Sequence, residues 1–210
     1  MKLFRRTILI AIIAAVCLTG IASAQSYAPI KLSKDERYAM NLFLSNFTEI
    51  GIDEISTWSM DNLLVDFAHD HMWFNSYDDF EYGNYFNGNN CRVSNDKIQK
   101  YIDKYFYDAG EVNLWETRFD YDGEYYYHCE TGGWINSGFA QTVSVCSLGY
   151  NEYYVSFMIF GSGEFWENDV MHLNIDQAAD TYGSPGGFGH ALVYAKDLSD
   201  RSTYKMIEYS

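Results

Sequence analysis

The sequence predicts an α+β fold in which three N-terminal helices pack on a curved antiparallel sheet of about six strands. Two observations support this prediction. Apolar residues recur at helical spacing up to about residue 106, and they alternate with polar residues at period two from about residue 119 onward. The clearest alternation lies in Phe139–Phe160, which reads as two strands joined by a short turn at the centre of the sheet.

The three helices are predicted from their start signals and their apolar stripes. Ser33 and Glu36 form the sequence pattern of a capping box, and Ser94 has the position of an N-cap. The predicted helices cover 34–47, 61–71 and 95–106. The stretch between the second and third helices, 75–90, is rich in Asn, Asp, Gly and Tyr and predicts a surface loop.

Two further hairpins flank the central one. The first covers 119–129 and turns at Asp122–Gly123, a dipeptide that favours a tight primed turn. The last pairs 191–194 with 204–209. Between the central and last hairpins, the glycine-rich connection 161–189 contains a candidate short helix at 174–181. A connection of this length is either functional or loosely ordered.

The first 24 residues have the features of a secretory signal peptide. A basic start precedes a mostly apolar run, and Ala22–Ser23–Ala24 is a cleavage site of the A-x-A kind. We therefore expect a secreted chain with one α+β domain at 25–210 and no stable membrane insertion after cleavage. Lipid attachment at Cys17 is the alternative, although the preceding Val16 fits a lipoprotein site poorly.

The chain is acidic and rich in aromatic residues. It has 29 acidic against 14 basic residues, with a formal net charge of −15, and loss of the leader makes the charge about −18 because three basic residues leave with it. Such a charge argues against nucleic-acid partners and against anionic membranes. Aromatic residues make up 18% of the chain. They indicate either a strongly curved sheet or a surface that stacks on sugar rings or partner proteins.

Three cysteines remain after leader cleavage: Cys91, Cys129 and Cys146. Export permits a disulfide. Three pairings are then open, and each leaves one cysteine over. A buried thiol that behaves as a small apolar residue is the alternative for each of them.

The segment order resembles an uncharacterised family of exported and lipid-anchored proteins from gram-positive gut bacteria. The resemblance rests on several stretches of the mature chain, of which Asn41–Phe47 is the most specific. The others are Leu32–Ser33 with Glu36–Arg37–Tyr38, Leu63–Ala68 with His71, Val93–Phe106 and Tyr204–Tyr209. The resemblance implies a common fold and export, and it implies no activity.

No metal or cofactor is predicted. Asp120–Tyr121–Asp122–Gly123 matches the start of a calcium loop, but the third acidic ligand and the distal Glu are missing. His69 and His71 are two residues apart, so a helix would point them in nearly opposite directions, whereas zinc-binding pairs use a spacing of four.

Two functions are compatible with these features. The first is a non-enzymatic binding module for a partner protein, peptide or glycan, with Trp134 and Trp166 as its candidate binding residues; Trp58 and Trp73 also lie in or near predicted connections. The alternative is a secreted cysteine-type hydrolase that pairs Cys91, shortly before a predicted helix, with His190 at the start of a predicted strand.

Overall fold

The structure is a computed structural model that describes residues 29–113, 115, 117–129, 138–161 and 168–210. Its described α-helices are α2 (Lys34–Thr48), α3 (Asp61–Asn75), α4 (Asn95–Tyr105) and α5 (Ile175–Tyr182). Short 3-10 helices are η1 (Tyr77–Asp79), η2 (Phe86–Gly88), η3 (Asn168–His172) and η4 (Arg201–Thr203). Within these described ranges, no helix combines the length and the apolar character of a membrane span.

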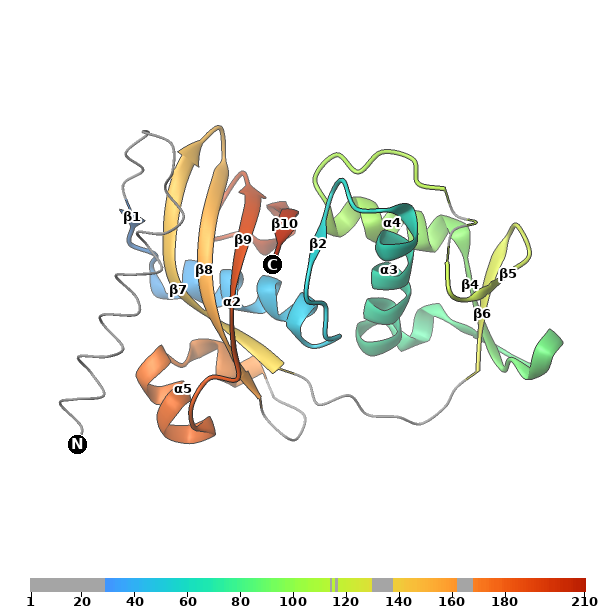
Figure 1. The fold of residues 1–210 in the computed structure, drawn as a ribbon, viewed down its shortest axis with the longest axis horizontal. Coiled ribbons are helices and arrows are strands. Elements are labelled where there is room, and N and C mark those ends of the chain that lie inside the picture. Colours follow the sequence, from blue (N-terminus) through green and yellow to red (C-terminus); the bar gives the residue numbers. More distant parts are fainter. Residues whose placement is uncertain (1–28, 114, 116, 130–137, 162–167) are drawn as a thin grey trace.

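The strands form two antiparallel sheets. The larger has the order β1-β7-β8-β9-β10-β2, and the smaller has the order β3-β4-β6-β5. The large sheet contains β1 (Pro29–Ile30), β2 (Ile55–Ser56), β7 (Gly138–Gly149), β8 (Glu152–Gly161), β9 (Gly187–Ala195) and β10 (Tyr204–Tyr209). The small sheet contains β3 (Glu81–Tyr82), β4 (Cys91–Ser94), β5 (Asp120–Tyr121) and β6 (Tyr125–His128). In Figure 1 the two sheets lie at opposite ends of the molecule, with α3 and α4 toward the small sheet.

Helix α2 packs against β7 and completes the hydrogen bonding of its outer edge. The short strand β1 pairs with only two residues of β7. Farther along the edge, Ala140 N–H donates to Ser45 Oγ (2.9 Å) and Thr142 N–H donates to Asn41 Oδ1 (2.8 Å). Thr48 Oγ1 donates to a carbonyl at the start of β7 (2.7 Å). Three polar side chains on one helix face thus replace a neighbouring strand, which protects an edge that could otherwise pair with another chain.

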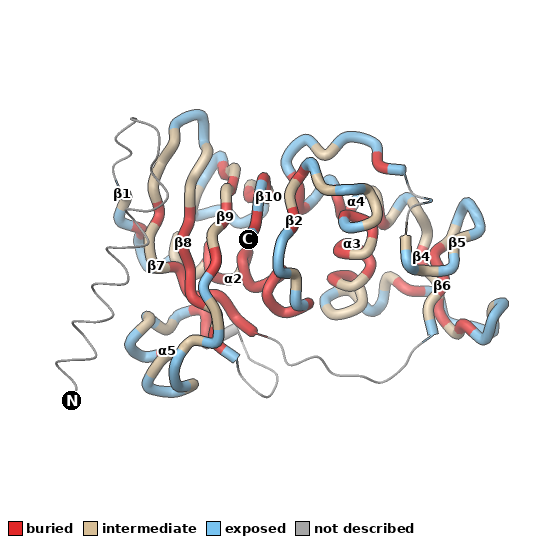
Figure 2. Tube along the Cα trace, viewed as in Figure 1, coloured by how far each residue is buried: buried red, intermediate tan, exposed pale blue. Residues whose placement is uncertain are grey.

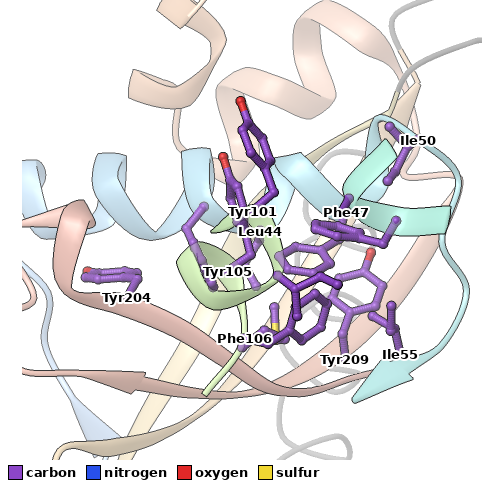
Figure 3. Close-up of a cluster of buried hydrophobic side chains, with 14 of the residues drawn as sticks. Leu44, Phe47, Ile50, Ile55, Tyr101, Tyr105, Phe106, Tyr204 and Tyr209 are labelled. Carbon is purple, nitrogen blue, oxygen red and sulfur yellow. The ribbon is translucent and has the colours of Figure 1, made fainter. Parts of the chain in front are cut away.

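Most of the buried apolar side chains form one cluster that reaches both sheets. It includes Val155 and Val193 of the large sheet and Val93 of the small sheet. Figure 2 shows buried stretches in both halves of the molecule. At the centre, Phe47 stacks on Phe67 (ring centroids 4.7 Å apart) and on Tyr209 (5.3 Å). Figure 3 shows how Phe47 and its neighbours from α2, α4, β2 and β10 meet.

The structure confirms the α+β class and corrects the helix arrangement. The predicted helices at 34–47, 61–71 and 95–106 are α2, α3 and α4, and the capping box of Ser33 and Glu36 is present. There are four described α-helices rather than three, because the candidate helix at 174–181 forms as α5. The hairpin predicted at 119–129 is present as β5 and β6, but it belongs to a separate small sheet that was not predicted, and β4 of that sheet lies in a stretch without a predicted element.

Candidate functional site

The candidate site is a groove on the outer side of the β9–β10 pair. Tyr194 of β9 is the cross-strand partner of Lys205 of β10, so the two side chains share one face of the sheet. Helix α4 ends beside β10, where Tyr107 N–H donates to the Met206 carbonyl (2.9 Å). This contact brings the Tyr107 ring onto Tyr194, with the ring centroids 4.5 Å apart and the ring planes 36° apart.

We name this cavity the Tyr107 groove. It has a volume of about 780 Å³, within the size range of small-ligand sites. The residues that matter for its chemistry are Asp103, Tyr107, Asp108, Tyr194, Lys196 and Lys205. Aromatic faces, two ammonium groups and two carboxylates therefore share one open surface, which suits a ligand with both flat apolar faces and polar groups.

Hydrogen bonds fix the wall that follows α4. Gln99 Nε2 donates to Asp103 Oδ1 (2.9 Å) and to the Gly110 carbonyl (3.0 Å), which folds the loop back on the helix. Asp108 (φ 53°) and Gly110 (φ 70°) adopt left-handed backbone conformations that turn the chain there. Lys205 Nζ donates to the Asp103 carbonyl and joins the wall to β10.

The opposite wall is a compact loop between β9 and β10. Thr203 Oγ1 accepts from Asp197 N–H (3.1 Å) and lies 3.0 Å from the Asp197 carbonyl. Asp197 and Asp200 accept the N–H and hydroxyl groups of Ser199 and Ser202, at 2.7 to 3.0 Å. The wall is thus held by its own side chains, so both sides of the Tyr107 groove are formed without a ligand.

An exposed tryptophan stands next to the groove. Thr57 donates its hydroxyl to the Tyr107 carbonyl, and Thr57 N–H donates to the Ile207 carbonyl (2.8 Å). The next residue, Trp58, is 73% exposed. Thr57 is tied to the groove wall, so the backbone of Trp58 lies close to it, and Tyr107 is itself 39% exposed.

The structure describes only two of the four tryptophans that were singled out from the sequence, Trp58 and Trp73. Trp134 and Trp166 lie outside the residues that the structure describes. Trp73 belongs to α3, which continues past the predicted helix end, and its ring packs on Phe80 (5.1 Å) and His128 (4.9 Å). Among the tryptophans singled out from the sequence, Trp58 is therefore the described one that a ligand can reach.

The structure does not bring Cys91 and His190 together. Cys91 is buried on β4, where its thiol donates to the His128 carbonyl (3.3 Å), whereas His190 belongs to β9 of the other sheet. In Figure 1, β4 and β9 are well separated. His190 Nδ1 instead lies 3.2 Å from Ser156 Oγ. Ser156 is only 4% exposed, so a substrate cannot reach that hydroxyl.

The structure describes three cysteines, Cys91, Cys129 and Cys146. No disulfide joins any two of them in the described ranges.

Asp122 accepts from Glu124 N–H and Tyr125 N–H (2.9 and 2.8 Å) and from the Tyr127 hydroxyl (2.6 Å), so its carboxylate closes the hairpin. Within the described part of the chain, no three His, Cys, Asp or Glu side chains are grouped to hold a metal ion.

A buried polar cluster joins α2 to α3. Asn75 Nδ2 donates to Glu49 Oε1 (2.5 Å), and His71 Nε2 lies 2.9 Å from Asn46 Oδ1 and 3.7 Å from Glu49 Oε1. Burial raises the pKa of Glu49 to about 7, against the effect of the Asn75 hydrogen bond. Burial, followed by the charges of two basic side chains, lowers the pKa of His71 to about 3. Burial therefore favours the neutral forms of both Glu49 and His71.

Comparison of the chain with protein-family models, curated proteins and solved structures found no match. The resemblance to an exported and lipid-anchored family therefore stays a prediction, as does export itself. A function has to be inferred from the Tyr107 groove and from the charges around it.

Sequence reasoning missed the groove because its two walls are distant along the chain. A parallel bridge between Phe106 and Met206 places Tyr107 beside Tyr194. A single bridge of this kind leaves no periodic pattern in the sequence. One signal was available: Tyr194, Lys196 and Lys205 occupy one end of a predicted hairpin, where alternate side chains share a face.

Proposed function

We propose that this chain is an exported, non-enzymatic binding module and that the Tyr107 groove binds a glycan. The observation that carries the proposal is the contact between the exposed Tyr107 ring and the half-buried Tyr194 ring on a preformed groove. Tyrosine combines an apolar ring with a polar tip, so it can pack on the flat face of a sugar while its hydroxyl group stays hydrated.

The polar groups of the groove support a glycan over an apolar ligand. The carboxylate of Asp108 can accept hydrogen bonds from sugar hydroxyls, and the ammonium group of Lys196 can donate to sugar oxygens. Both side chains belong to exposed residues, so their use by a ligand requires no rearrangement of the core. Ligand sites of this kind keep a few polar groups beside an apolar platform.

The geometry gives the cysteine-hydrolase alternative no support. A thiolate–imidazole pair needs hydrogen-bond reach between the two groups. Cys91 is buried in the small sheet, and His190 contacts Ser156 in the large sheet.

The test is binding of the purified protein to a glycan array, repeated with the Tyr107→Ala/Tyr194→Ala double variant. We expect selective binding of at least one glycan class and an affinity loss of at least tenfold, about 1.4 kcal/mol, in the variant, since it removes both rings on which the sugar would pack. Tyr82→Ala is the matched control, because it removes a 46%-exposed tyrosine from β3 of the small sheet.

Two results would contradict the proposal. One is an array without any bound glycan. The other is a glycan whose affinity is the same for the native protein and the double variant while both proteins are folded, as judged by circular dichroism. A loss in Tyr82→Ala as large as that in the double variant would also argue against the Tyr107 groove.

A further inference from the structure

We infer that the ligand of the Tyr107 groove is an acidic oligosaccharide, one whose sugar rings carry carboxylates. This inference rests on the proposed function and adds the charge and the length of the ligand to it. Its basis is a gathering of basic side chains around the groove in a molecule that is otherwise strongly acidic.

Two basic side chains line the groove, and three more belong to the segments that form its walls, although Lys104 lies over the rings of Tyr101 and Tyr105. Lys196 and Lys205 line the groove, and Arg201 belongs to the η4 wall between two lining segments. Lys100 and Lys104 lie on α4 and influence each other and the β9–β10 side electrostatically. In a chain with 29 acidic and 14 basic residues, this concentration makes the groove region far less negative than the molecule as a whole.

None of these cations is paired with a carboxylate of the described residues, although Lys205 donates to the Asp103 carbonyl. Elsewhere, Arg92 pairs with Glu81 at 2.7 Å and Lys97 pairs with Asp79 at 3.4 Å. Within the described ranges, by contrast, no carboxylate oxygen lies within 4.0 Å of the charged nitrogen atoms of the five groove cations. Those five are Lys100, Lys104, Lys196, Arg201 and Lys205.

Holding these cations together is unfavourable without a counter-ion. Burial lowers the pKa of Lys104, and the like charges of Arg201, Lys100 and Lys205 lower it further, while Asp79 opposes them. An anionic ligand between the two walls relieves this repulsion, because opposite charges a few ångströms apart attract at a protein surface.

Carboxylates also lie in the region and offset part of its positive charge; burial lowers the pKa of Lys205, and the charge of Asp103 opposes this shift. Asp197 and Asp200 accept the hydrogen bonds of Ser199 and Ser202 and hold the loop. Asp103 accepts from Gln99. The Asp108 carboxylate faces the groove lining and suits the hydroxyl groups that a sugar has in addition to its charge.

The aromatic surface indicates a chain of several sugars rather than a single one. Tyr107 and Tyr194 form one platform, and the exposed Trp58, which follows the wall-bonded Thr57, is a candidate second platform. A single sugar covers one platform. An oligosaccharide can stack on both and can place successive carboxylates against Lys196 and Lys205.

The test is isothermal titration calorimetry of the native protein with four probes: oligogalacturonate, hyaluronan oligosaccharides, a neutral galactose oligomer and hexaglutamate. The inference predicts that at least one of the two acidic sugars binds ten times or more tightly than the neutral oligomer. The affinity should fall as salt rises from about 50 mM to about 500 mM, because salt screens exposed charges.

Variants assign the charge preference to the groove. The double variant Lys196→Gln/Lys205→Gln should lose about tenfold in affinity for the acidic sugar, while its affinity for the neutral oligomer changes little. The control is Lys97→Gln, which removes the same charge from a lysine that already pairs with Asp79. It should leave the affinity within about twofold of the native value.

The outcomes separate this inference from the proposed function. Equal affinity for acidic and neutral sugars, with a loss in Tyr107→Ala/Tyr194→Ala, would overturn the inference and leave glycan binding standing. An unchanged affinity in Lys196→Gln/Lys205→Gln would also overturn it. Binding of hexaglutamate in preference to all three sugars, or binding of none of the four probes, would overturn the inference and count against the glycan-binding proposal as well.

Discussion

The α2–β7 contact and the Tyr107 groove both contain polar side chains, and they use them in opposite ways. In the α2–β7 contact, Asn41 accepts from Thr142 N–H (2.8 Å) and donates to Gln141 Oε1 (2.9 Å) and to the Met171 carbonyl (3.1 Å), all within the interior. In the groove, Lys196 is exposed and has no carboxylate partner in the described part of the chain. The first region uses its polar groups to hold the fold, whereas the groove uses Asp103 and Lys205 in its walls and leaves Lys196 exposed.

This difference gives a criterion for separating structural from functional residues. The Asn41–Phe47 stretch is the most specific part of the family resemblance, and its polar members Asn41 and Ser45 close the edge of β7. A distinctive sequence stretch therefore has a structural explanation here. The side chains of Tyr107 and Tyr194 line the groove, and the exposure of the Tyr107 ring suits binding.

Asn41→Ala should give the largest effect on stability. It removes three hydrogen bonds and leaves the Thr142 N–H without its acceptor in the interior, which should lower the free energy of unfolding by about 4 kcal/mol. Urea denaturation of the native and variant proteins measures the change. A loss below about 1 kcal/mol would mean that the edge of β7 does not need the hydrogen bonds from α2.

Glu49 should produce the next largest effect, as a dependence of stability on pH. Its pKa is raised from 4.5 to about 7 by burial, so the folded protein prefers the neutral carboxyl group. The associated stability is complete below pH 4.5 and is lost as the pH rises through 7, by about 3 kcal/mol in all. Glu49→Gln should remove this decline, and Glu54→Gln, at an exposed glutamate nearby, should keep it.

His71 should act in the opposite direction on the acidic side. Its pKa is lowered from 6.5 to about 3, so its stabilising effect is present above pH 6.5 and is lost as the pH falls toward 3. Together the two groups place their joint optimum between about pH 4.5 and 6.5. Thermal unfolding followed across this range tests both, and an unchanged profile in Glu49→Gln would contradict the raised pKa.

Tyr107→Ala should have a small effect on stability. The ring is part-exposed and packs mainly on Tyr194, so the free energy of unfolding should fall by less than about 1 kcal/mol. Affinity for a glycan should nevertheless fall at least tenfold. Urea denaturation beside a binding titration measures both quantities. A large loss of stability would mean that Tyr107, like Asn41, holds the fold.

The thiols should show the smallest effect, a difference in labelling rate with no change of stability. Cys129 is exposed, whereas Cys91 is buried on β4. An alkylating reagent followed by mass spectrometry should label Cys129 first and Cys91 last in the folded protein. Rapid labelling of Cys91 would contradict the burial of β4 and would reopen a chemical role for that residue.

The sequence was sufficient for elements that depend on local patterns. Each of these patterns is local in the sequence. They are the capping box at Ser33, the alternation in 139–160 and the Asp122–Gly123 turn. The other two strands of the small sheet, β3 and β4, were not predictable in this way. Strand β4 has only four residues, and it is defined by its pairing with β6, from Cys91 opposite His128 to Ser94 opposite Tyr125.

The groove depended on tertiary contacts that no sequence window contains. Tyr107 and Tyr194 are far apart in the chain and meet because the segment after α4 bonds to Met206. The aromatic excess was compatible with exposed rings as well as with a curved sheet, and Trp58 is an exposed ring. The sequence pattern could not indicate that Trp73 is partly buried, because that depends on the extra turn of α3 and on His128 of the small sheet.

A two-dimensional ¹H–¹⁵N NMR titration with oligogalacturonate tests most directly whether the Tyr107 groove binds an acidic glycan. The account predicts shift changes concentrated in 103–110 and 194–205, with smaller changes at Trp58, and none around Asn41 or Cys91. Shift changes confined to the small sheet, or spread evenly over the acidic surface, would contradict the assignment of binding to the Tyr107 groove.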